Sequence, residues 1–102
     1  MSGRNSRKWL MDKIETYIGF SVKKGSVVFG LDCLTRYRKK LYLVVVTQSV
    51  AEKTKANAKQ YAEQRNVPFA VVSDYEILLK RNCKVLGICD KSLADAIVAN
   101  IQ

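Results

Sequence analysis

The sequence predicts an α/β fold, a three-layer α/β/α sandwich around a four-stranded mixed sheet. Short apolar runs alternate with longer segments whose apolar residues recur every three or four positions, as in amphipathic helices. One run, 41–46, is apolar throughout, which is typical of a central strand covered on both faces. The chain has 102 residues and shows no linker or repeat. We therefore treat 1–102 as one domain, with residues 1–5 as a loose tail.

Residues with strong backbone or capping preferences set the expected boundaries. Ser6, Thr47 or Ser49, and the pair Ser73–Asp74 can cap helix N-termini, and Asn66 can end a helix. The expected order is α-β-α-β-α-β-α-β-α. In chain order it comprises a helix closed by Lys23–Gly25, a strand at 26–29, a helix at about 31–39, a strand at 41–46, a helix to about 65, a strand at 69–72, a short helix at 75–79, a strand at 85–89, and a last helix opened by 90–92.

The charge distribution is the strongest functional signal. The chain has 18 Lys and Arg against 9 Asp and Glu, a net charge of +9. Residues 1–40 hold ten basic and three acidic side chains (+7), whereas residues 41–102 hold eight and six (+2). A basic excess in one part of a small domain favours a polyanion partner, most often nucleic acid. The alternative is a basic surface that only keeps the protein soluble.

Several other classes of protein find little support. No apolar stretch is long enough to span a membrane, and the N-terminus lacks a secretory signal, so we expect a cytoplasmic protein. We also expect a monomer. With three cysteines, no CxxC pair and no His, a zinc site is not expected. Phosphate-loop and dinucleotide motifs are absent, so we expect no cofactor. Without His, acid–base and triad chemistry are poorly served, and we expect no enzymatic activity.

The stretch 23–40, KKGSVVFGLDCLTRYRKK, reads as a strand, a sharp turn at Gly30 and a basic helix. A glycine there suggests positive φ or close approach to another molecule. The first N–H groups of the following helix would point outward and favour an anion. Tyr37 and Tyr42 lie among the cations and could stack on bases, although partly buried packing is the more frequent role of such tyrosines. We therefore expect RNA to bind at this turn.

The segment 18–36, IGFSVKKGSVVFGLDCLTR, resembles the "iGlarkaGklvsG" opening of small bacterial YlxQ-like proteins. These proteins belong to the kink-turn RNA-binding ribosomal protein superfamily (L-seven-Ae, L-thirty-e and relatives). The likeness covers roughly residues 8–99 and continues through LYLVVVTQS, NVPFAVVSDYE and GICDKSLADAI. The resemblance implies an α/β/α sandwich that binds structured RNA, with ribosomal RNA and ribosomal proteins as candidate partners.

The family's RNA-binding loop resembles G-x-N-E-x-x-K, which Gly30 and Arg36 match at the first and last positions. Asp32 and Cys33 stand where the family has Asn and Glu, and they lack that pair's amide donor and carboxylate acceptor. We therefore expect phosphate contacts to persist while kink-turn specificity is degraded. The basic residues are expected around the same end of the fold. The predicted RNA-binding residues are Lys23, Lys24, Gly30, Leu31, Asp32, Cys33, Arg36, Lys39, Lys40, Gln48, Lys80, Arg81 and Lys84.

Two alternatives stay open. The loss of the Asn–Glu pair fits a protein-interaction adaptor built on the same fold. A redox or enzymatic role centred on Cys33 is the third, because a thiol near a helix N-terminus can have a lowered pKa.

Overall fold

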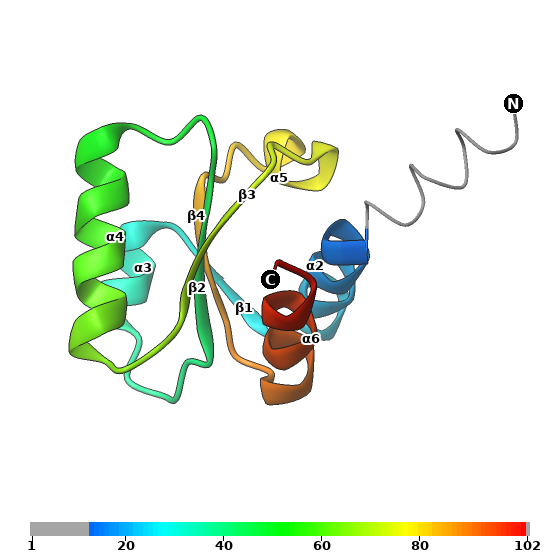
Figure 1. Ribbon diagram of the computed structural model, residues 1–102, viewed down its shortest axis with the longest axis horizontal. Helices are drawn as coiled ribbons and strands as arrows, with labels where there is room; N and C mark the ends of the chain where they lie inside the picture. The colour runs from blue at the N-terminus through cyan, green and yellow to red at the C-terminus, as the bar shows by residue number, and fades with distance from the viewer. Residues whose placement is uncertain (1–12, 102) are drawn as a thin grey trace, which may run out of the picture.

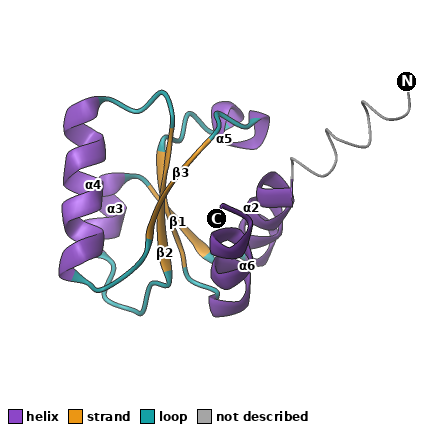
Figure 2. Cartoon of the chain, viewed as in Figure 1, coloured by secondary structure: helices purple, strands orange, loops and turns teal. Residues whose placement is uncertain are grey.

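The computed structural model describes residues 13–101, so the expected tail at 1–5 and the cap at Ser6 lie outside the described residues. Helices and strands alternate along the chain as expected (Figures 1 and 2). The elements are α2 (Lys13–Lys24), β1 (Val27–Phe29), α3 (Leu31–Arg36), β2 (Leu43–Thr47), α4 (Glu52–Gln64), β3 (Phe69–Val72), α5 (Glu76–Lys80), β4 (Val85–Ile88) and α6 (Lys91–Ile101).

The four strands form one mixed sheet in the order β1-β4-β2-β3. β4 is antiparallel to both neighbours, β1 and β2, whereas β2 and β3 run parallel. Helices α3 and α4 cover one face, and α2, α5 and α6 lie on the other (Figure 1). The predicted three-layer α/β/α sandwich around a four-stranded mixed sheet is therefore confirmed.

Strand β2 supplies both cores because its side chains alternate between the two faces of the sheet. Leu43 and Val45 pack into the cluster with α2 and α6, and Val44 and Val46 pack against α3 and α4. Every residue of β2 is buried. The all-apolar run thus marked a strand covered on both faces, as predicted.

The predicted second helix is three residues too long. α3 ends at Arg36, and Tyr37 continues in an extended conformation with φ −73° and ψ 122°. The Arg65 side chain donates hydrogen bonds to the carbonyls of Tyr37 (3.3 Å) and Lys39 (3.1 Å). Those carbonyls therefore have partners outside the helix, and the run of cations from Arg36 to Lys40 extends along the surface.

The predicted caps of the third and fourth helices are wrong for one shared reason. α4 begins after Ala51 and α5 after Tyr75, each without a side-chain cap. The Ser49 hydroxyl donates to the Asp74 carboxylate at 2.6 Å, so two predicted caps bind one another. By contrast, Asp90 does cap α6, accepting the Leu93 N–H at 3.0 Å.

The strand register gives the sheet two distinct ends. At the first, which we call the cleft end, β1, β2 and β3 finish at Phe29, Thr47 and Val72, and β4 starts at Val85. At the second, the loop end, β4 finishes at Ile88 and the other strands begin. Among the helices at 13–101, none is long and apolar enough to cross a membrane.

Candidate nucleic-acid interface

Gly30 forms a sharp corner at the cleft end. Its φ of 88° and ψ of 148° fall in a region that is essentially restricted to glycine, which confirms the positive φ expected there. Its N–H donates to the Val85 carbonyl at 2.8 Å, and its own carbonyl accepts the Leu34 N–H at 3.0 Å. A Cβ placed on Gly30 would meet nothing within 4 Å, so the corner opens to solvent.

The turn from Arg81 to Lys84 faces this corner. Asn82 adopts φ 50°, a left-handed conformation that asparagine tolerates and that ends helices such as α5. The backbone N–H of Cys83 then donates to Leu78 at 3.0 Å, and the Cys83 side chain is buried. Burial raises the pKa of that thiol, so it stays protonated at neutral pH. The turn therefore buries the neutral side chain of Cys83 in the core and leaves the side chains of Arg81 and Lys84 exposed.

Between the corner and the turn lies a cleft of about 470 Å³, which we call the Gly30 cleft. The Arg81 guanidinium stands 5.2 Å from the centre of the Phe29 ring, close enough for a cation–π contact at the cleft wall. The lining residues are Phe29, Gly30, Leu31, Val50, Ala51, Thr54, Arg81, Asn82, Cys83, Lys84 and Val85.

Four predicted site residues line this cleft: Gly30, Leu31, Arg81 and Lys84. The wall of the cleft formed by Val50, Ala51 and Thr54 was not predicted. Their position directly after β2 was the available signal, because ligands in α/β folds usually bind outside strand ends. Gln48 and Lys80 belong to the same end without lining the cleft, and Lys80 lies 3.7 Å from Glu76.

One acidic group moderates the charge at the cleft end. The hydrogen bond from Ser49 is the largest cause that lowers the pKa of Asp74 below its ordinary 3.8, and the positive charge of Lys84 adds to the effect. Asp74 is therefore ionised at neutral pH and offsets part of the potential of Lys84.

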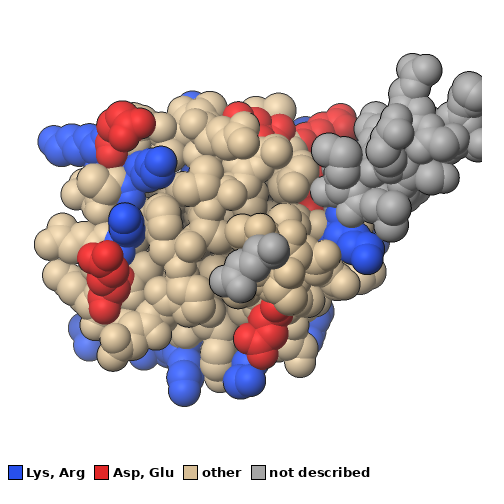
Figure 3. Space-filling view, in the orientation of Figure 1, with Lys and Arg blue, Asp and Glu red and all other residues tan. Residues whose placement is uncertain are grey.

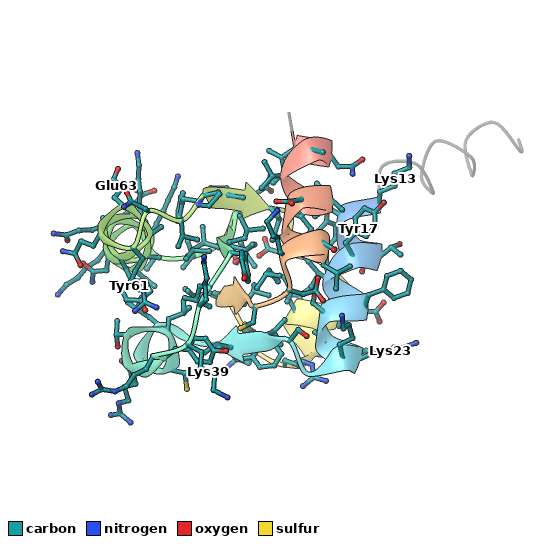
Figure 4. All side chains as sticks on the ribbon, turned by 90° about the horizontal axis from the view of Figure 1, so that it is seen from below. Lys13, Tyr17, Lys23, Lys39, Tyr61 and Glu63 are labelled. Atoms are coloured by element: carbon teal, nitrogen blue, oxygen red, sulfur yellow. The ribbon has the colours of Figure 1, made fainter. Side chains whose placement is uncertain are left out.

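The other predicted cations lie at the loop end, so the expectation that all of them share one end is wrong. Lys24 pairs with Asp90, which follows β4, and the hydrogen bond from Lys24 is the main cause that lowers the pKa of Asp90. Figure 3 shows basic side chains along the lower edge of the molecule, which is the loop end of Figure 1. In Figure 4, seen from that end, Lys39 lies beside α3 and Lys23 projects from α2 on the other side of the sheet. Lys40 lies over the Tyr42 ring, 5.6 Å from its centre.

Asp32, Cys33 and Arg36 lie on α3, between the two ends, and all three are exposed. With six residues, α3 has a smaller dipole than the longer helix that we expected. Gly30 also provides no side chain to cap it.

The two tyrosines of the basic region are half-buried packing residues. Tyr37 packs with the α3–α4 core, and a hydrogen bond with the Cys89 side chain is the main cause that raises its pKa. Cys89 is itself half-buried. Neither ring is displayed as a free stacking platform.

Within residues 13–101, no three His, Cys, Asp or Glu side chains gather in a way that could hold a metal ion.

No protein-family model matches this chain, and a search of curated proteins finds no match either. Among solved structures, the fold is similar to that of a protein with unknown function from Bacillus halodurans C, with a TM-score of 0.73. The two chains are 16% identical, and the match covers 87% of this chain and 96% of that chain. Similarity at this level of identity shows a shared α/β fold.

Proposed function

We propose that this protein is a non-enzymatic RNA-binding module of the cytoplasm, associated with ribosomal or other structured RNA. The observation that carries the proposal is the Gly30 cleft. There an open backbone corner that only glycine forms faces two exposed cations, Arg81 and Lys84. A ribose-phosphate chain fits this arrangement, because cations supply the salt-dependent attraction to phosphates and an open backbone lets the chain approach closely.

The resemblance to the kink-turn ribosomal proteins supports the same end of the molecule. Gly30 and Arg36 match the family's loop motif; Gly30 lines the cleft, and Arg36 ends the helix whose first residue, Leu31, also lines it. Asp32 and Cys33 are exposed on α3 but do not offer the donor and acceptor pair that reads the bases of a kink-turn. The proposed mode is therefore recognition of the backbone and shape of RNA, with reduced preference for kink-turns.

A titration with two RNAs tests the proposal. A kink-turn hairpin and a plain duplex of equal length are titrated at two salt concentrations, with the wild type, R81A/K84A and K13A/K59A. Lys13 and Lys59 are exposed on α2 and α4, and each double variant lowers the net charge by two, so long-range attraction changes equally. We expect salt-sensitive binding of both RNAs and roughly tenfold or greater weakening in R81A/K84A relative to the control. No binding at low salt, or equal binding by the two variants, would contradict the proposal.

An adaptor for another protein is the second candidate, and exposed apolar side chains favour it. Phe20 is 49% exposed and borders a second cleft, of about 490 Å³, together with Leu93. Apolar side chains around a concave surface are typical of protein-binding sites. Recovery of a protein partner after nuclease treatment, lost on Phe20→Ala, would favour the adaptor.

A further inference from the structure

The segment from Arg36 to Lys40, RYRKK, concentrates positive charge more strongly than any other five consecutive residues of the chain. Four of its five side chains are cationic, and these four are exposed. Three ion pairs are found within residues 13–101, and they join Lys24 to Asp90, Lys80 to Glu76 and Lys91 to Asp95. The cations of this basic segment are in none of them, so their charge is not offset by a contacting acid among the described residues.

The backbone of the basic segment is held in place by α4. The Arg65 guanidinium donates to the carbonyls of Tyr37 and Lys39, at 3.3 and 3.1 Å, and lies 5.5 Å from the centre of the Tyr61 ring. The Tyr61 hydroxyl donates to the Leu34 carbonyl in α3. Tyr37 is half-buried against the core. The cations therefore project from an anchored backbone, so a bound polyanion would have less chain to order.

The basic segment is separate from the Gly30 cleft. It leads into β2 at the loop end, whereas the cleft lies where β2 finishes. β2 has five residues, so its two ends are roughly 13 Å apart at about 3.3 Å per residue. Arg36, the last residue of α3, is the member of the segment nearest the cleft, and residues 37–40 continue from it toward the start of β2. The screening length at physiological ionic strength is about 8 Å. At that salt concentration, phosphates at one end are therefore largely screened from the cations at the other.

We propose that the basic segment is a second RNA-contacting surface, so that one chain holds two stretches of RNA backbone at opposite ends of its sheet. The inference rests on the proposed function for its first surface, the Gly30 cleft. In this segment Arg38, Lys39 and the neighbouring cations contact phosphate oxygens and do not contact base edges, so they do not recognise RNA sequence. Arg38 and Lys39 are the best probes, because both side chains are exposed and their removal creates no buried cavity.

The number of short RNA hairpins bound per chain tests the inference. Native mass spectrometry at low salt is combined with energy transfer between donor- and acceptor-labelled hairpins. The proteins are the wild type, R38A/K39A, R81A/K84A and the control K13A/K59A. Each variant has two positive charges fewer than the wild type, and circular dichroism checks that each is folded. We expect two hairpins per chain and energy transfer in the wild type and the control. Each of the other two variants should bind one hairpin and lose the transfer. Because each variant removes two cations, the overall salt slope of RNA binding should fall by the equivalent of at least two phosphate contacts in each.

The outcomes separate this inference from the proposed function. If one hairpin binds, is lost in R81A/K84A and is retained by R38A/K39A, the second surface is overturned and RNA binding at the cleft stands. One hairpin weakened by both variants would mean a single continuous site and would also overturn it. If the wild type binds no hairpin, both proposals fail. If R38A/K39A alone loses RNA, binding at the cleft is overturned and two-ended binding with it. Should the alanine variant misfold, R38Q/K39Q provides the same comparison with longer side chains.

Discussion

The Gly30 cleft and the basic segment both present cations, but the chain builds them in different ways. The cleft is concave and depends on two residues with positive φ, Gly30 and Asn82, while Asp74 offsets part of its charge. The basic segment begins at the last residue of α3 and continues to Lys40 outside any helix or strand. Its charge has no contacting acid within 13–101, and Arg65 holds its backbone. Under the proposed function, the difference predicts that the cleft selects RNA by shape and that the segment attracts it by charge.

Helix α3 joins the two regions, so the largest effect should follow from Leu34→Ala. Leu34, on α3, is fully buried against α4 and the sheet. A Cβ added to Gly87 would lie 2.5 Å from the Leu34 side chain, so the packing here is tight. We expect a loss of about 2–5 kcal/mol in the free energy of unfolding, and weaker RNA binding at both ends. Chemical denaturation measures the loss. Leu79→Ala, at a residue 59% exposed, is the control and should cost far less. A loss no greater than in the control would mean that α3 does not brace both regions.

Gly30→Ala should separate the regions. The backbone of Gly30 lies where other residues are strained by roughly 1–3 kcal/mol, so the corner should either destabilise the fold or rearrange. Binding at the cleft should fall, and binding at the basic segment should persist. Gly25→Ala is the matched control, since Gly25 also has positive φ (72°) but lies near the loop end. Denaturation and RNA titration of both variants check this. Equal RNA affinity in the two variants would remove Gly30 from the interface.

Arg65→Ala should affect the basic segment alone, and more modestly. The substitution removes two hydrogen bonds to the carbonyls of Tyr37 and Lys39, at a net cost on the order of 1 kcal/mol. Backbone order parameters of residues 37–40 should fall while those at the cleft stay unchanged. Glu63→Ala, also exposed near the end of α4, is the control. Unchanged order in the segment would show that Arg65 does not hold it.

The smallest expected effect is a change in the pKa of one carboxyl group, which an acid titration can assign to one end of the sheet. The pKa values of Asp74 and Asp90 are both lowered, mainly by Ser49 and Lys24 respectively, so each carboxylate favours the folded state when ionised. This stabilisation is present above the ordinary pKa of 3.8 and is lost as the pH falls through each lowered value. Ser49→Ala should bring the pKa of Asp74 back toward normal and leave that of Asp90 unchanged. NMR of the carboxyl carbons measures the pKa of Asp74 and that of Asp90. A change in both pKa values on Ser49→Ala would contradict the view that Ser49 acts on Asp74 alone.

Local pattern was enough to predict the layers and most strands. The all-apolar run before Thr47 is typical of a covered strand, and the glycine between an apolar run and a helix marked the corner. The hydrogen bond between Ser49 and Asp74, which leaves α4 and α5 without their predicted caps, could not be predicted, because the two residues are 25 positions apart and meet only when β2 and β3 pair.

The distribution of the cations was harder to predict for a similar reason. Lys23, Lys24, Lys39 and Lys40 flank the corner in sequence, but a strand or helix separates them from it in space. The antiparallel register of β4 places Lys84 beside the corner and Asp90 at the far end, beside Lys24. Sequence proximity therefore indicated one cluster of cations, whereas the sheet separates them into two groups.

The most direct test is an NMR titration of isotope-labelled protein with a short RNA hairpin, followed at every backbone amide. Two-ended binding predicts shift changes in two groups, residues 29–31 with 81–85 at the cleft and 36–40 at the basic segment, while the outer faces of α2 and α6 stay unchanged. Changes centred instead on those outer faces around Phe20, or no changes at low salt, would contradict RNA binding at these surfaces.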